Sequence, residues 1–267
     1  MSRPVRLATF ADPDAGPTHP PRAGEVRGDH VVAYESGVSV RDLLAEPRPA
    51  DGAEHALDGL RLLAPVPRPR AIFGIGLNSA AHAKETGRDL PEFPIVFMKL
   101  PSSSAAPNGD VTVPEACWRR LDYEGELAVV MGAHGVIAGY AIADDLSARD
   151  LQGREPQWTR AKGFDSSCPW GPWVTTADEV PDPRALELTT HVNGEERQRS
   201  PTSDLVFDPG QLVGFLSETI TLEPGDVILT GTPDGVGVAM DPRQFLQRGD
   251  VVRIEITGLG AIEHSVR

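Results

Sequence analysis

The order of apolar and polar residues along the chain is typical of a protein built mainly from short strands. Short apolar runs recur, and glycine, proline, asparagine or aspartate separates them, as expected of strands joined by tight turns. Helices are predicted over 209–217 and over a short segment that begins at Asn78 or Ser79 and ends at Gly87. Strands are predicted over 71–77, 95–100, 121–131, 139–143, 186–192, 226–230 and 251–256, the last forming a hairpin with 261–266. The pattern therefore predicts an α+β, β-rich fold.

The first 64 residues have a pattern of their own. They predict a strand over 5–10, a turn rich in proline and glycine, a hairpin around 25–35 and a short helix over 39–46. Residues 62–69 carry prolines at alternate positions and indicate an extended connector. We therefore predict a small N-terminal domain over 1–64 and a larger domain over 65–267.

The composition is that of a globular protein with an acidic surface. Hydrophobic residues make up 40% of the chain, and 25 basic residues stand against 39 acidic ones, a net charge of −14. This balance argues against nucleic-acid partners and against binding to an anionic membrane. No segment resembles a signal peptide or a membrane span, so a cytoplasmic protein is expected. The two cysteines, Cys117 and Cys168, have no metal-binding spacing and indicate free thiols.

Two glutamates lie two residues apart in the most apolar predicted strand, 121–131. Alternate side chains of a strand point to the same face, so Glu124 and Glu126 would share a face, about 7 Å apart along the backbone. The apolar continuation, Leu-Ala-Val-Val, indicates burial on both faces, where two carboxylates need a compensating positive charge. A divalent cation would supply it. The alternative is a solvated edge strand with alternating polar residues.

A second acidic group, Asp144 and Asp145, follows the next predicted strand. Three carboxylates around one ion would form an all-oxygen site, which suits Mg²⁺, Mn²⁺ or Ca²⁺ better than zinc. The same residues are also typical of a helix N-cap, which is the commoner role for aspartate or serine at such a position. From spacing alone, both interpretations stay open.

Two further segments carry residues typical of active sites. His82 and Glu85 are three residues apart on the predicted short helix, where a carboxylate can orient an imidazole as a general base, although surface pairs of this kind are common. Lys162 precedes segment 168–173, which is rich in proline, glycine and tryptophan and is expected to be turn-rich. This lysine either faces an anion in a partly desolvated site or is an ordinary surface lysine.

A glycine-rich loop, 231–237, follows the predicted strand 226–230. It lacks the Lys-Ser/Thr pair of a P-loop and the following helix of a dinucleotide site, so it is not interpreted as a phosphate-binding loop. Its composition supports a turn that brings Thr232 close to a ligand.

Seven motifs, taken in order, resemble the fumarylacetoacetate hydrolase (FAH) family. They are GIGLN with HAKE, FMKLPSS, LDYEGELAVVMG, ADDLSARDLQ, AKGFD with GPW, TSDL, and LEPGDVILTGTPDGVG. The resemblance covers residues 62–267. It implies a mixed β-roll catalytic domain preceded by a small N-terminal domain, and usually a homodimer.

The resemblance also implies roles for individual residues. One Mg²⁺ or Mn²⁺ per subunit would be held by Glu124, Glu126 and Asp145. The implied catalytic residues are the His82–Glu85 dyad and Lys162. The implied substrate contacts are Gln152 and Thr232. Beyond the resemblance, Arg88 and Arg149 are candidates for binding the distal end of the substrate, with a structural role after Asp145 as the alternative for Arg149.

These roles imply a hydrolase that cleaves a C–C bond in a 2,4-dioxo acid such as an acylpyruvate or fumarylpyruvate. The metal would chelate the 2-oxo acid, His82 would activate a water, and the metal and Lys162 would stabilise a pyruvate enolate. One alternative is a decarboxylase or isomerase of catechol meta-cleavage products, such as 5-oxopent-3-ene-1,2,5-tricarboxylate or 2-hydroxyhepta-2,4-diene-1,7-dioate. Another is a non-catalytic member that binds metal and small acids.

Three positions depart from the family pattern. Ser79 stands where tyrosine often follows the asparagine, Asp144 where asparagine is frequent, and Ala161 where glycine often precedes the lysine. None is an implied metal ligand or a member of the dyad. The departures therefore bear on the shape of the pocket and on the substrate.

Overall fold

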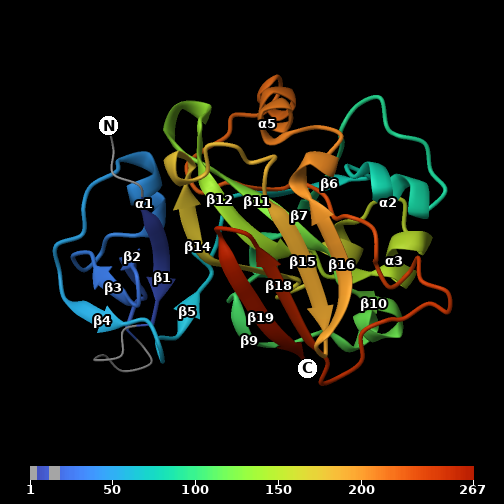
Figure 1. Ribbon diagram of the computed structural model, residues 1–267, viewed down its shortest axis with the longest axis horizontal. Helices are drawn as coiled ribbons and strands as arrows, with labels where there is room; N and C mark the ends of the chain where they lie inside the picture. The colour runs from blue at the N-terminus through green and yellow to red at the C-terminus, as the bar shows by residue number, and fades with distance from the viewer. Residues whose placement is uncertain (1–4, 12–18) are drawn as a thin grey trace.

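A twelve-stranded mixed sheet forms the framework of the computed structural model, which describes residues 5–11 and 19–267 (Figure 1). Two short strands, β5 (Leu62–Leu63) and β8 (Ser104–Ala105), pair with β1 and β14. The others follow one another as β4 (Glu54–Ala56), β3 (His30–Ala33), β2 (Arg22–Arg27), β1 (Arg6–Phe10), β14 (Cys168–Thr176), β12 (Ile137–Asp144), β11 (Gly125–Met131), β17 (Val227–Leu229), β6 (Ile72–Gly76) and β7 (Ile95–Lys99). Most neighbours are antiparallel, but β17 and β6 are parallel. The mixed, β-rich fold expected from the sequence is confirmed.

The strand predicted over 121–131 is interrupted. Residues 121–122 form β10 (Leu121–Asp122), which pairs with β13 (Ser147–Ala148), whereas β11 begins at Gly125 and pairs with β12. Residues 123–124 carry the chain from one partner strand to the other, so Glu124 lies just before β11 and not within one continuous strand. As predicted, β11 is buried on both faces, because all seven of its residues are buried.

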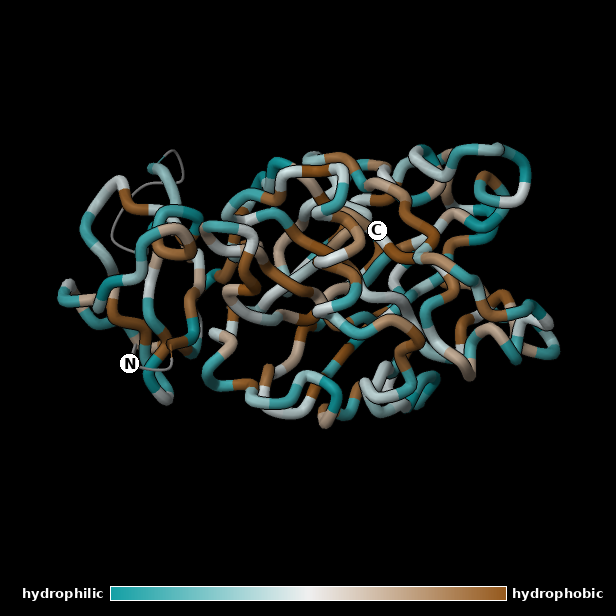
Figure 2. Tube along the Cα trace, turned by 90° about the horizontal axis from the view of Figure 1, so that it is seen from above, coloured by the Kyte–Doolittle hydropathy of each residue, from teal (hydrophilic) through white to brown (hydrophobic). Residues whose placement is uncertain are grey.

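A second, five-stranded sheet packs across the middle of the first. Its order is β16 (Glu195–Pro201), β15 (Glu187–Val192), β18 (Val251–Ile256), β19 (Gly260–Val266) and β9 (Asn108–Val111). Apolar side chains such as Leu127, Ile142 and Ile254 fill the space between the sheets, and Figure 2 shows hydrophobic segments running through the interior. The two sheets approach each other closely at Gly125, where a Cβ atom would lie 2.3 Å from Thr190 Oγ1. Only glycine therefore fits between the two glutamates.

The N-terminal residues form a lobe at one end of the long axis (Figures 1 and 2). It contains β1 to β4 and α1 (Val40–Ala45), whose N-cap Ser39 forms a capping box with Asp42. The expected strand, hairpin and helix are present, and the turn expected after Phe10 falls largely on residues that are not described. Because β1 pairs with β14, the main sheet continues into this lobe. The division of the chain at residue 64 stays a prediction.

The helices are short and lie at the ends of strands. Both predicted helices of the larger part exist: α2 (Ala80–Glu85), with Ser79 as N-cap, and α5 (Pro209–Ser217). Two unpredicted helices are α3 (Arg149–Arg154) and α4 (Thr159–Lys162). The remaining helical turns are of the 3₁₀ type: η1 (Pro101–Ser103), η2 (Glu115–Arg120), η3 (Ala133–Gly135), η4 (Ala177–Glu179) and η5 (Thr202–Asp204). Among the described residues, none of the helices has the length and apolar composition needed to cross a bilayer.

Segment 168–173, expected to be turn-rich, is instead the first part of strand β14. That prediction was wrong because the segment pairs with β12 at Trp170 and Gly171 and with β8 at Cys168 and Pro169, and Trp170 is fully buried. Burial and this pairing outweigh the local preference of proline and glycine for turns.

Candidate active site

Three carboxylates meet where β11 begins and β12 ends. Each of Glu124, Glu126 and Asp145 offers an oxygen, these oxygens lie within 4.8 Å of one another, and all three residues are buried. Strand pairing sets this arrangement, because Gly125 is opposite Asp144 and the amide of Asp145 donates to the carbonyl of Glu124 at 2.9 Å. The structure thus brings together the three residues predicted as metal ligands. We call them the carboxylate floor.

The glycine-rich loop holds one edge of the carboxylate floor. The amide of Gly231 donates to Glu126 Oε2 at 2.6 Å. Thr232 Oγ1 donates to the carbonyl of Gly125 at 3.0 Å and accepts from Gln198 Nε2 at 2.9 Å. The hydroxyl proton of Thr232 is therefore already engaged, and a ligand would find only an acceptor there.

Three buried cations surround the carboxylate floor. Lys162 Nζ donates to Asp145 Oδ2 at 2.7 Å and also contacts Glu124. Lys99 Nζ donates to Asp145 Oδ1 at 2.7 Å and to the carbonyl of Lys162. Arg149 forms ion pairs with Glu124 Oε1 at 2.7 Å and with Asp122 Oδ2 at 2.8 Å. Lys162 is therefore a buried partner of the floor and not a surface lysine.

The two glutamates differ in electrostatic environment. Burial raises the pKa of Glu124, but Arg149 and Lys162 outweigh burial and hold this pKa at about 2. Burial also raises the pKa of Glu126, and the like charges of Asp145 and Glu124 raise it further, well above its ordinary value. Glu126 therefore lacks sufficient positive charge from the protein itself. A divalent cation among the three oxygens would supply it, and the all-oxygen donor set fits Mg²⁺ or Mn²⁺.

Helix α2 carries the predicted dyad on another wall of the site. His82 Nδ1 lies 3.4 Å from Glu85 Oε2, and Glu85 Oε1 accepts from the amide of Gly235 at 3.0 Å. Because Glu85 faces Nδ1, the other ring nitrogen, Nε2, is left for a reacting group. His82 is buried, with 8% of its surface exposed, so it differs from a solvated surface histidine.

One cavity of about 800 Å³ joins these parts. Its lining includes the dyad, Lys162 and both glutamates of the floor, and the floor's third member, Asp145, contacts Lys162. All three predicted substrate-binding residues also line the cavity: Gln152, Thr232 and Arg88. Gln152 accepts a hydrogen bond from Arg149 Nη1 at 3.0 Å.

The sequence interpretation gave no role to several residues of the site. Lys99 is fully buried, and its only local signal is a lysine at the end of an apolar strand in the motif FMKLPSS. Gln198 binds both Thr232 and the amide of Gly125 at 3.0 Å, but it comes from β16, a strand that was not predicted. Arg243 lines the cavity without any motif to mark it.

A cavity that holds three carboxylates, a His–Glu pair and a buried lysine defines the class of the protein as an enzyme with a small-molecule site. The family model described as "Fumarylacetoacetate (FAA) hydrolase C-terminal" matches residues 71–267. The chain belongs to the fumarylacetoacetate hydrolase family.

Similar proteins within and near this family differ in their reactions. The mitochondrial oxaloacetate tautomerase of Xenopus laevis is 41% identical over 230 residues, 81% of this chain and 72% of that protein. The fumarylacetoacetate hydrolase structure from Exiguobacterium antarcticum is 33% identical, with a TM-score of 0.86 over 98% of this chain and 99% of that one. A 5-carboxymethyl-2-hydroxymuconate delta-isomerase from Mycobacterium smegmatis is 37% identical, with a TM-score of 0.80 over 98% of both chains.

Proposed function

We propose that this protein catalyses metal-dependent proton transfer at C3 of a short 2-oxo dicarboxylic acid, which interconverts its enol and keto forms. The observation that carries the proposal is the single cavity in which a buried histidine, paired with Glu85, faces the carboxylate floor. The tautomerase and isomerase relatives support this reaction class, because both names describe movement of a proton without loss of carbon.

The residues of the cavity have separate roles in the proposed proton transfer. A divalent cation held by Glu124, Glu126 and Asp145 would polarise the 2-oxo group and acidify the C3–H bond. Glu85 orients His82 through Nδ1, so that His82 Nε2 takes the proton from C3 of the keto form and delivers it to the C2 oxygen, which gives the enol. The ammonium of Lys162 donates a hydrogen bond toward the oxygen that gains negative charge in the enolate.

The second carboxylate of the substrate also has partners in the cavity. Arg88 and Arg243 line it, and within the described part of the chain neither forms an ion pair with an acidic side chain. Arg149, by contrast, is already engaged with Asp122 and Glu124. Free guanidinium groups bind carboxylates in a bidentate manner, so Arg88 and Arg243 favour a dicarboxylic acid over a neutral acyl chain.

Hydrolysis of a 2,4-dioxo acid is the second candidate. The same His82 would activate a water against the distal carbonyl, and cleavage would release pyruvate. The volume of about 800 Å³ favours this candidate, because it exceeds what a four-carbon acid needs. Decarboxylation or isomerisation of larger meta-cleavage acids fits the same volume.

A substrate panel with Mg²⁺ or Mn²⁺ separates these candidates. We expect the protein to accelerate the ultraviolet absorbance change of oxaloacetate tautomerisation, with no release of pyruvate or CO₂ beyond the uncatalysed rate. Pyruvate release from acylpyruvates as the faster reaction would establish hydrolysis instead. No turnover of any 2-oxo acid would leave a binding protein and refute both candidates.

Sedimentation of the same preparation tests whether the protein is a homodimer, which stays a prediction.

A further inference from the structure

The position of the dyad depends on contacts outside the catalytic cavity. Helix α2 has only six residues, and a helix of this length is not stable without tertiary contacts. The chain enters it through Leu77, whose φ of 54° lies in the left-handed region that non-glycine residues rarely adopt. Something beyond local preference must therefore hold the start of α2.

Asp204 supplies that contact from a distant part of the chain. It belongs to η5, after β16, and it does not line the catalytic cavity. Its Oδ2 accepts from Ser79 Oγ at 2.5 Å and from the amide of Ala81 at 3.2 Å. Ser79 Oγ in turn accepts from the amide of His82 at 3.1 Å. A chain of two hydrogen bonds thus runs from Asp204 to the backbone of the proposed base.

Backbone contacts align the two segments beside this pair. Ser79 forms an isolated antiparallel bridge with Leu205, and the amide of Val206 donates to the carbonyl of Asn78 at 2.9 Å. The side-chain amide of Asn78 donates to the carbonyl of Thr230 at 2.7 Å. The start of α2 is therefore tied both to the loop after β16 and to the end of β17.

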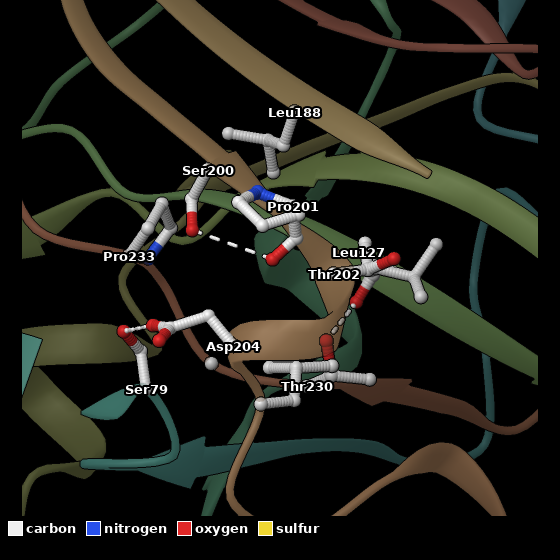
Figure 3. Close-up of a pocket in the computed structure, with 11 residues that line it drawn as sticks. Ser79, Leu127, Leu188, Ser200, Pro201, Thr202, Asp204, Thr230 and Pro233 are labelled. Atoms are coloured by element: carbon white, nitrogen blue, oxygen red, sulfur yellow. Dashed lines mark hydrogen bonds between the residues drawn. The ribbon is translucent and has the colours of Figure 1, made fainter. Parts of the chain in front are cut away.

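Asp204 and Ser79 both line a small cavity of about 20 Å³, which has room for about one water (Figure 3). Ser79 and Asp204 lie on one side of it, joined by a dashed line, and Leu188 and Ser200 lie on another. Shortening the side chain at position 204 would enlarge this small cavity and leave the lining of the catalytic cavity unchanged. A change in turnover would then report the placement of α2.

We propose that Asp204 and Ser79 form a clamp that places His82 over the carboxylate floor, so that Asp204 is a positioning residue for the reaction. The inference rests on the proposed role of His82 as the base. Glu85, bound to the amide of Gly235, holds the other end of α2. The clamp acts on the dyad and not on the metal ligands, which lie on β11 and β12 or directly beside them.

One oxygen of Asp204 accepts both hydrogen bonds. Substitution by asparagine therefore removes only the charge, whereas substitution by alanine removes the acceptor as well. Asp204→Asn keeps an oxygen acceptor for Ser79 and Ala81, and we expect turnover within about threefold of the unsubstituted protein. Asp204→Ala removes both acceptors, and we expect kcat to fall about 10- to 100-fold, because small misplacements of a catalytic group are costly. KM and Mn²⁺ affinity should change little.

A second substitution and a matched control complete the test. Ser79→Ala should also lower kcat. The double variant Ser79→Ala/Asp204→Ala should be at most about threefold slower than the slower of the two single variants, because both substitutions break the same linkage. Asp208→Ala is the control. Asp208 caps α5 four residues further along and does not touch α2, so its loss should leave kcat unchanged.

Hydrogen exchange of peptide 78–87 gives a readout that does not depend on activity. We expect faster exchange there in Asp204→Ala, with protection of β11 and β12 unchanged. Unchanged hydrogen exchange together with unchanged kcat in Asp204→Ala would overturn the clamp. A loss of kcat in Asp204→Asn as large as that in Asp204→Ala would also overturn it. If the unsubstituted protein turns over none of the panel, the proposed function fails, and the exchange result alone still decides whether the clamp exists.

Discussion

The carboxylate floor and helix α2 face the same cavity but are held in different ways. The floor is buried at the junction of two long paired strands, with three cations around it. The dyad lies on a six-residue helix that depends on a few side-chain contacts at its ends. A rigid charged floor can hold a cation in a fixed place, whereas a lightly held helix can adjust a base over the substrate. The four predictions below test that division.

The largest effect is expected from removing a floor carboxylate. Glu126→Gln should lower Mn²⁺ affinity more than about 100-fold in calorimetric titration, because one of three oxygen ligands loses its charge. Stability of the metal-free protein at pH 7 should not fall, because the variant removes the carboxylate that lacks compensation. Glu255→Gln, on the exposed side of β18, is the control. Unchanged Mn²⁺ binding would refute the metal site.

The next effect separates α2 from the floor. His82→Ala should lower kcat about 10²- to 10⁴-fold, the range for loss of a general base, while Mn²⁺ affinity stays the same. His191→Ala is a matched control, because His191 lies 4.0 Å from Glu196 in a His–Glu pair outside the cavity. Loss of metal binding in His82→Ala would show that the two regions are not independent.

Lys99 tests how the floor itself is supported. Lys99→Met removes a fully buried ammonium from Asp145 and from the carbonyl of Lys162, and it should destabilise the protein by about 3–5 kcal/mol. Urea unfolding measures the loss. Lys84→Met, at an exposed position of α2, should change stability by less than about 0.5 kcal/mol. Similar values for both variants would mean that Lys99 does not support the floor.

The smallest effect is a pH dependence of the metal-free protein. The pKa of Glu124 is about 2 in the folded state against 4.5 for the ordinary side chain, so its ionised form favours folding. This contribution is present above pH 4.5 and is lost as the pH falls toward 2. In a chelator, Glu124→Gln should therefore lose less stability than the unsubstituted protein between pH 5 and pH 3. Parallel pH profiles would contradict the lowered pKa of Glu124.

The sequence predicted those parts of the site that depend on local pattern. Ser79 as the N-cap of α2 and Gly87 beyond its end are local signals, and both hold, with Gly87 at a φ of 66°. The approach of Glu124 to Glu126 also follows from short spacing. Lys99 could not be placed in the same way, because a lysine at the end of an apolar strand is usually solvated. Its burial becomes favourable through contacts with Asp145 and with the carbonyl of Lys162.

The strands, like the site, could be predicted only where residues close together in the chain determine them. The strand over 251–256 and its hairpin partner follow from alternation and a turn, which act between neighbours in the chain. The break at residues 123–124 and strand β14 arise from partners far away in sequence. Propensity could not reveal them, because pairing energies exceed the local preference of glycine and proline.

The sequence by itself determined the family, the short elements with their caps, and the carboxylate, histidine and lysine groups available for chemistry. Only the tertiary structure decided that Asp145 lies beside Glu124 and that Lys99 and Arg149 surround them. It alone tied α2 to Asp204, which is 125 residues away from Ser79. The physical reason is that charge compensation and clamping act through space, between groups whose separation along the chain gives no periodic signal.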